Sequence, residues 1–164
     1  MKHRFTVFAA LLIASWVTMT ITHELGHILG GWLGGATLTD YDLAPWRLPF
    51  SLHSPDPAPL LTLWAGPILG VIVPFVVASA VRRRWVWFIA DFCLIANGAY
   101  LALAWASGDR HLDTPRLLEA GTPPVTILIY CGATIGLGYF WVRSDCIYFL
   151  GMPVPSEKQP TPKA

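Results

Sequence analysis

The amino-acid sequence predicts an all-α membrane protein, a bundle of about four transmembrane helices with a proline-rich loop after the first. Over half of the 164 residues are hydrophobic (54%) and only 13% are charged, which is unlike an ordinary soluble domain. The apolar residues also gather into runs close to the ~20 residues that a helix needs to cross a bilayer. These runs are residues 5–33, 60–81, 85–106 and 125–142.

The segment between the first two runs, residues 36–59, is polar and rich in proline. Prolines at this density exclude a regular helix. Residues 36–43 alternate weakly between apolar and polar side chains, which predicts a short strand or hairpin. We therefore expect a transmembrane core over residues 1–150, followed by a disordered proline-rich tail over residues 151–164.

Basic residues cluster at the N-terminus (Lys2, Arg4) and between the second and third runs (Arg82–Arg84). By the positive-inside rule these segments are cytoplasmic, so both termini lie inside and the chain is a multi-pass protein of the cell membrane. The expected partners are the lipid bilayer and a membrane-protein substrate. A net charge of +1 gives no reason to expect nucleic acid as a partner.

The motif His23-Glu24-Leu25-Gly26-His27 lies inside the first apolar run. Histidines four residues apart share one face of a helix and can bind one Zn²⁺, while Glu24 is placed to accept a proton from water. Such a motif also arises by chance in soluble proteins. Within a membrane span, however, three ionisable side chains need a partner or a ligand, which favours a metal site with Glu24 as the catalytic residue.

A catalytic zinc site needs a third protein ligand. The candidates are Asp113 and Asp109, followed by His111, His53 and Asp91. We expect His53 to be a solvated loop histidine and Asp91 to pair with one of the nearby arginines. Thr114-Pro115 is typical of a helix start, with Thr114 as the cap.

Further segments complete a pattern around this motif: Ala65-Gly66-Pro67 in the second run, Asn97 in the third, and Leu112-Asp113 after it. Together they resemble the site-2 protease family of intramembrane zinc metalloproteases. The resemblance implies His23, His27 and Asp113 as the metal ligands, and a membrane-embedded substrate held in an extended form, for which Asn97 and residues 36–59 are candidate contacts. Thr114 stands where the family has glycine, and the chain has no room for a PDZ domain.

Because of that departure, Asp109 remains an alternative third ligand. The resemblance also implies a site nearer the cytosol, whereas the basic residues predict a site nearer the outer face. Two functions follow as hypotheses. The first is a zinc-dependent intramembrane endopeptidase; the alternative is a non-catalytic membrane protein that binds a metal or a substrate.

Overall fold

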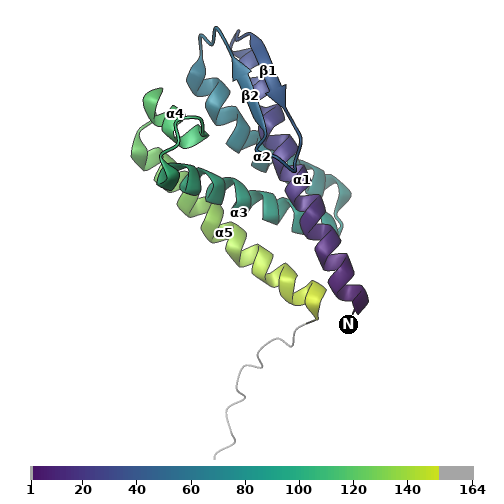
Figure 1. The fold of residues 1–164 in the computed structure, drawn as a ribbon. Coiled ribbons are helices and arrows are strands. Elements are labelled where there is room, and N and C mark those ends of the chain that lie inside the picture. Colours follow the sequence, from purple (N-terminus) through teal and green to yellow (C-terminus); the bar gives the residue numbers. More distant parts are fainter. Residues whose placement is uncertain (1, 152–164) are drawn as a thin grey trace, which may run out of the picture.

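The computed structural model describes residues 2–151, so the tail predicted for residues 151–164 lies, from residue 152 onward, outside the described residues. The elements follow in the order α1, β1, β2, α2, α3, α4, α5 (Figure 1). Four helices are long and apolar enough to cross a membrane: α1 (Lys2–Leu33), α2 (Pro59–Val81), α3 (Arg84–Ser107) and α5 (Pro124–Leu150). This confirms the all-α membrane bundle that the apolar runs predict.

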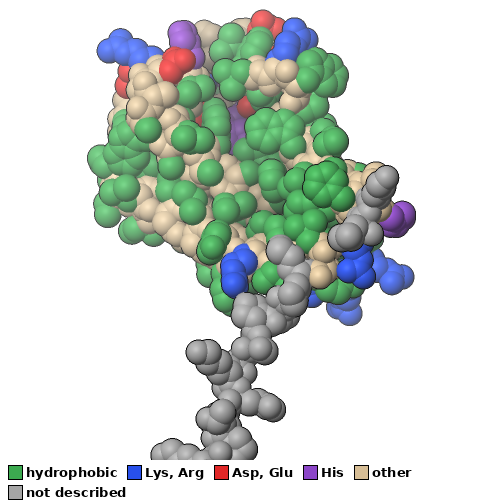
Figure 2. All heavy atoms as spheres, turned by 60° about the horizontal axis from the view of Figure 1, so that its bottom comes forward, with side chains coloured by type: hydrophobic (Ala, Val, Ile, Leu, Met, Phe, Trp, Pro, Cys, Tyr) green, Lys and Arg blue, Asp and Glu red, His purple; other side chains and the backbone are tan. Residues whose placement is uncertain are grey.

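The surface of the bundle has the polarity expected of an integral membrane protein. Figure 2 shows hydrophobic side chains covering the middle of the molecule, with charged side chains gathered towards its two ends. Large apolar residues on this surface are well exposed, among them Leu103, Ile129 and Phe140. In water such a surface would be an aggregation hazard, whereas in a bilayer it meets the acyl chains.

The helices pack as two main pairs, α1 with α2 and α3 with α5. Glycines allow α1 to approach α2 closely: a Cβ built on Gly26 would lie 2.5 Å from the carbonyl oxygen of Ala65. Small residues at helix contacts are the usual means of close packing in membranes. The glycines of α1 therefore serve packing.

A buried cluster joins the other helices near the end of the bundle that carries the hairpin. It contains Leu63 of α2, Leu101 of α3, Ile127 and Cys131 of α5, and Leu117 of the short helix α4 (Asp113–Glu119). Leu117 is fully buried. This contact fixes α4 against the transmembrane helices, although α4 is too short to span the membrane itself.

The polar loop after α1 forms an antiparallel hairpin of β1 (Leu38–Asp42) and β2 (Phe50–His53). The hairpin predicted for this loop is confirmed, although its second strand lies beyond residue 43. The strands lie beside the C-terminal part of α1 (Figure 1). Along β2, Ser51 is buried and the two residues beside it are exposed, so alternate side chains of β2 face α1.

The opposite end of the bundle corrects two predictions. Asp91 was expected to pair with a nearby arginine, but Arg84 pairs with Asp145 instead. Nη2 and Nε of Arg84 lie 2.7 Å and 2.8 Å from Oδ1 of Asp145. Helix α5 continues past residue 142 to Leu150, so it carries the buried Asp145 into the bundle. Asp91 lies beside Asp145. We call Arg84, Asp91 and Asp145 the arginine cluster.

Candidate metal centre

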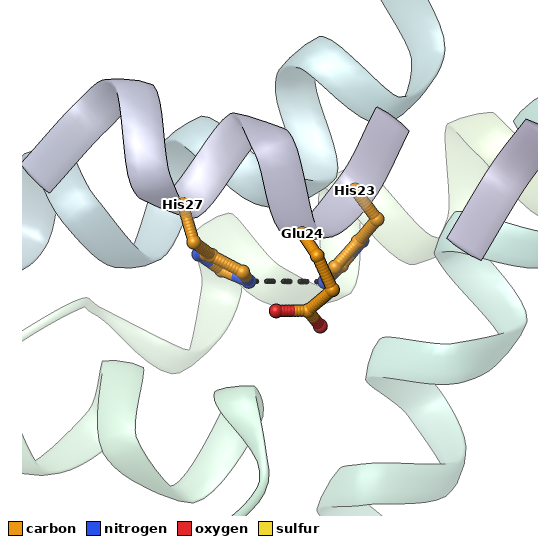
Figure 3. A group of neighbouring side chains, drawn as sticks. All are labelled: His23, Glu24 and His27. Carbon is orange, nitrogen blue, oxygen red and sulfur yellow. Dashed lines mark hydrogen bonds between the residues drawn. The ribbon is translucent and has the colours of Figure 1, made fainter. Parts of the chain in front are cut away.

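His23 and His27 lie one turn apart on the same face of α1, because an α-helix brings residues i and i+4 together. Their Nε2 atoms are 3.0 Å apart, and both rings point to the same side of the helix (Figure 3). Glu24 lies beside them. Ligand atoms of the three side chains all fall within 4.8 Å of one another, so the group could hold a metal ion.

Asp113 reaches the histidines from the start of α4. Its Oδ2 atom lies 2.8 Å from Nε2 of His23 and 3.1 Å from Nε2 of His27. Two contacts hold α4 in place: the buried side chain of Leu117, and a 2.7 Å hydrogen bond from the Thr114 hydroxyl to the carbonyl of Leu101. Thr114 is therefore not the predicted helix cap; its hydroxyl joins α4 to α3 instead.

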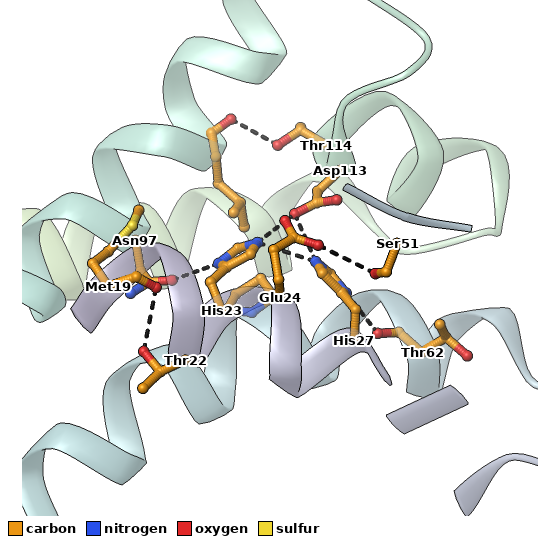
Figure 4. Close-up of polar contacts among 12 residues, drawn as sticks. Met19, Thr22, His23, Glu24, His27, Ser51, Thr62, Asn97, Asp113 and Thr114 are labelled. Atoms are coloured by element: carbon orange, nitrogen blue, oxygen red, sulfur yellow. Dashed lines mark hydrogen bonds and ion pairs between the residues drawn. The ribbon is translucent and has the colours of Figure 1, made fainter. Parts of the chain in front are cut away.

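The outer nitrogen of each imidazole meets an acceptor (Figure 4). Nδ1 of His27 lies 2.8 Å from the carbonyl oxygen of Thr62, and Nδ1 of His23 lies 2.7 Å from Oδ1 of Asn97. The amide of Asn97 donates to the carbonyl of Cys93, which assigns Oδ1 as the acceptor. Each neutral imidazole therefore carries its proton on Nδ1, and its Nε2 lone pair faces inward.

This arrangement leaves three electron-rich atoms converging on one point: Nε2 of His23, Nε2 of His27 and Oδ2 of Asp113. Lone pairs facing one another at 2.8–3.1 Å repel unless a proton or a metal ion lies among them. All three side chains are at most 7% exposed, so water does not screen the repulsion. The geometry is that of a cation site with each imidazole oriented by a partner on its far side.

The Asp113 carboxyl is ionised in this setting. Burial raises its pKa, but a proton on the histidines, whose positive charge and hydrogen bonds then reach Oδ2, outweighs burial and holds the pKa of Asp113 well below its usual range, so a proton balances this carboxylate when no metal ion does. An ionised carboxylate is the form that binds a metal.

Glu24 is buried beside the converging atoms. Its Oε2 accepts a hydrogen bond of 3.2 Å from the hydroxyl of Ser51 on β2, a contact drawn in Figure 4. The hairpin thereby holds the carboxylate of Glu24 next to the histidines and at the wall of a cavity of about 450 Å³.

The remaining candidate ligands lie elsewhere. Asp109 is exposed, and its carboxylate accepts a hydrogen bond from the backbone N–H of His111. Asp91 belongs to the arginine cluster. The structure thus brings Asp113, and not Asp109, against the two histidines.

His53 was expected to be solvated, and that prediction was wrong. Its ring packs against Gly31 of α1, and both ring nitrogens are buried with no hydrogen-bond partner among the described residues. Burial lowers the pKa of His53, which keeps the ring neutral.

Sequence reasoning missed three contributors: Ser51, the carbonyl of Thr62, and Tyr100, whose ring centroid lies 5.2 Å from that of His23. Tyr100 follows Asn97 by three residues, so helical spacing from Asn97 could have placed it on the same face. A single serine in a loop and a backbone carbonyl carry no such signal.

No family model, curated protein or solved structure matches this chain. The site is therefore interpreted from its own geometry.

Proposed function

We propose that the protein is a zinc-dependent intramembrane endopeptidase of the cell membrane, a small member of the site-2 protease family. The observation that carries this proposal is the convergence of two imidazole nitrogens and one carboxylate oxygen inside a membrane bundle, with a second carboxylate beside them. Two histidines, one acidic ligand and an open fourth position are the donor set of catalytic zinc in hydrolases.

The spacing of the donor atoms fits zinc. In a tetrahedral site with ligand distances of about 2.0–2.2 Å, neighbouring ligand atoms lie about 3.3–3.6 Å apart. The three atoms here lie 2.8–3.1 Å apart, so a small outward movement of the side chains accommodates the ion. Nitrogen and carboxylate donors also suit zinc better than calcium or magnesium, which prefer oxygen ligands alone.

The residues divide the chemistry among them. When bound, Zn²⁺ supplies Lewis acidity that makes water nucleophilic near neutral pH and polarises the scissile carbonyl. Glu24 takes a proton from the attacking water and then delivers it to the leaving amine. Ser51 orients the carboxylate of Glu24, while Asn97 and the Thr62 carbonyl orient the two imidazoles. The substrate is a membrane-embedded protein that unwinds locally, because a helix hides its carbonyl groups.

Glu24→Gln tests the proposal. In protein reconstituted into liposomes with single-span reporter proteins, this change is expected to abolish cleavage, detected by mass spectrometry, while zinc content stays near that of the wild type. Glutamine keeps the size and polarity of the side chain, so the variant isolates the loss of the base. Ser107→Ala, at the exposed end of α3, is a control that should alter neither property.

One observation favours a second candidate, a non-catalytic metal-binding protein. A carboxylate oxygen of Glu24 lies close enough to the histidine nitrogens to act as a further ligand. A site closed by four protein ligands is structural, with no position left for water. In that case Glu24→Gln lowers zinc content as strongly as Asp113→Ala does, and the wild type cleaves no reporter.

A further inference from the structure

Two cavities adjoin Glu24 and share Tyr100 as part of their walls. The larger, about 450 Å³, extends from Glu24 and Asp113 towards Arg110 and Arg116, and we call it the basic cavity. The smaller, about 240 Å³, extends from His23 and Glu24 towards the middle of α1, and we call it the apolar cavity. A peptide whose scissile bond lies at Glu24 would place neighbouring residues in both.

The basic cavity contains a positive charge that the chain itself does not balance. The side chain of Arg116 is partly buried and makes no hydrogen bond or ion pair with any residue that the structure describes. Arg110 has only a 3.8 Å contact with Glu119, and both of these side chains are largely exposed. The acidic groups nearby are already engaged, Asp113 by the histidines and Glu24 by Ser51.

The apolar cavity differs in character. Trp16 and Met19 of α1 form its wall, and a 2.7 Å hydrogen bond from Nε1 of Trp16 to the carbonyl of Pro45 fixes the loop there. Its basic residue, Arg47, is bound by Asp42 at 3.1 Å. This cavity therefore presents an apolar surface to a substrate, and its basic side chain is already paired.

The two cavities also differ in depth along the bundle. Trp16 lies about 10 Å from His23 along α1, towards the middle of the span. The basic cavity lies at the end of α1 that carries the hairpin and α4, where the chain leaves the apolar band. The apolar cavity thus lies at a depth where the membrane favours apolar groups, and the basic cavity lies where the membrane tolerates charged groups.

We propose that the substrate carries a carboxylate on one side of the scissile bond, received by Arg116, and a bulky apolar side chain on the other, received beside Trp16. The proposal rests on the proteolytic function above and narrows its substrate to a membrane segment that ends at an acidic group. Arginine binds a carboxylate in a bidentate manner, which gives geometry as well as attraction. The carboxylate is an aspartate or glutamate side chain, or the C-terminus of a peptide.

Synthetic peptides with a leucine-rich stretch provide the test. One series places Asp, Asn or Lys at each position near the cleaved bond, with an amidated C-terminus; a second series keeps Asn and varies a free against an amidated C-terminus. The wild type is expected to cleave a carboxylate peptide at least tenfold more efficiently than its amide counterpart, mainly through KM. The two series distinguish a side chain from a terminal carboxylate.

Arg116→Gln should remove most of this preference, while Arg47→Gln, in the apolar cavity, should retain it. The peptide series needs no variant, so it remains decisive if Arg116→Gln fails to fold. Equally efficient cleavage of the Asp, Asn and Lys peptides, and of peptides with free and amidated termini, would overturn the substrate proposal. It would still support the proposed proteolytic function.

Absence of cleavage with zinc bound would instead overturn the proposed function. The same peptides, now carrying a fluorescent label, can then be tested for binding to Glu24→Gln by fluorescence anisotropy. This measurement decides the substrate proposal separately. Carboxylate-dependent binding that Arg116→Gln weakens supports the recognition site, and binding indifferent to the carboxylate rejects it.

Discussion

The candidate metal centre and the arginine cluster both bury carboxylates in a bundle of membrane helices, but they balance the charge differently. In the arginine cluster, Arg84 supplies a cation from within the chain and binds Asp145 at 2.7 Å. In the metal centre, Asp113 meets two imidazoles whose protons are directed outward to Asn97 and Thr62. No arginine or lysine among the described residues forms an ion pair with Asp113.

The difference shows how a structural ion pair is distinguished from a ligand site. A charge buried in a membrane needs a partner. Where the chain provides the partner, as Arg84 does for Asp145, the contact is a structural ion pair. Where only acceptors converge, the balancing cation is a proton or a metal ion taken up from solution. The following predictions test whether the two ends really differ in this way, beginning with the largest expected effect.

Asp113→Ala removes the one carboxylate among the described residues that lies within hydrogen-bond distance of Nε2 of both histidines. Zinc affinity should fall by more than 100-fold, since a site with two histidines alone binds weakly. Measurement of zinc content after dialysis against a weak chelator checks this. Asp109→Ala, which alters an exposed aspartate a few residues away, should retain full zinc content; the reverse result would transfer the third ligand to Asp109.

Asn97→Ala removes the acceptor for Nδ1 of His23. Loss of such an orienting partner typically weakens metal affinity by about 10–100-fold, and competition with a chromogenic chelator measures it. Asn97→Asp keeps an acceptor at the same position and should restore much of the affinity. Equal loss in both variants would indicate a packing defect at this buried position.

Gly66→Ala tests the fit of the metal centre from the side of α2. A Cβ at this position would collide with the ring of His27, so the ring has to move and zinc affinity should fall by about tenfold. Gly136→Ala on α5 is the matched control, because its Cβ meets nothing within 4 Å. Retained affinity in Gly66→Ala would mean that His27 tolerates displacement.

Asp145→Asn acts on the arginine cluster alone. It leaves Arg84 without its carboxylate, and the free energy of unfolding should fall by about 1–2 kcal/mol, because the half-exposed guanidinium still reaches water. Thermal unfolding in detergent measures the loss. Zinc content should stay unchanged, since Asp145 is paired with Arg84 at the end of the bundle opposite the histidines. A fall in zinc content would contradict the separation of the two ends.

Much of the fold could be predicted from the sequence, because it depends on local patterns. Each span is a continuous apolar run, and its length relative to the bilayer decides that it is a helix. The ends of the helices were harder to predict. The apolar run ends at residue 142, where charged side chains begin, but α5 continues as a helix to Leu150. The hairpin was anticipated from one strand only, since its partner begins at Phe50 after a proline-rich turn.

By itself the sequence determined that this chain is a membrane bundle and that His23 and His27 share one helical face with Glu24 next to them, because helix periodicity brings together residues four apart. Only the tertiary structure decided between Asp113 and Asp109, which lie on either side of a short turn and are chemically alike. Asp113 is 90 residues from His23, and its approach depends on Leu117 and Thr114 fixing α4 to the bundle. The pairing of Arg84 with Asp145 was decided in the same way, because no local pattern records which helices pack together.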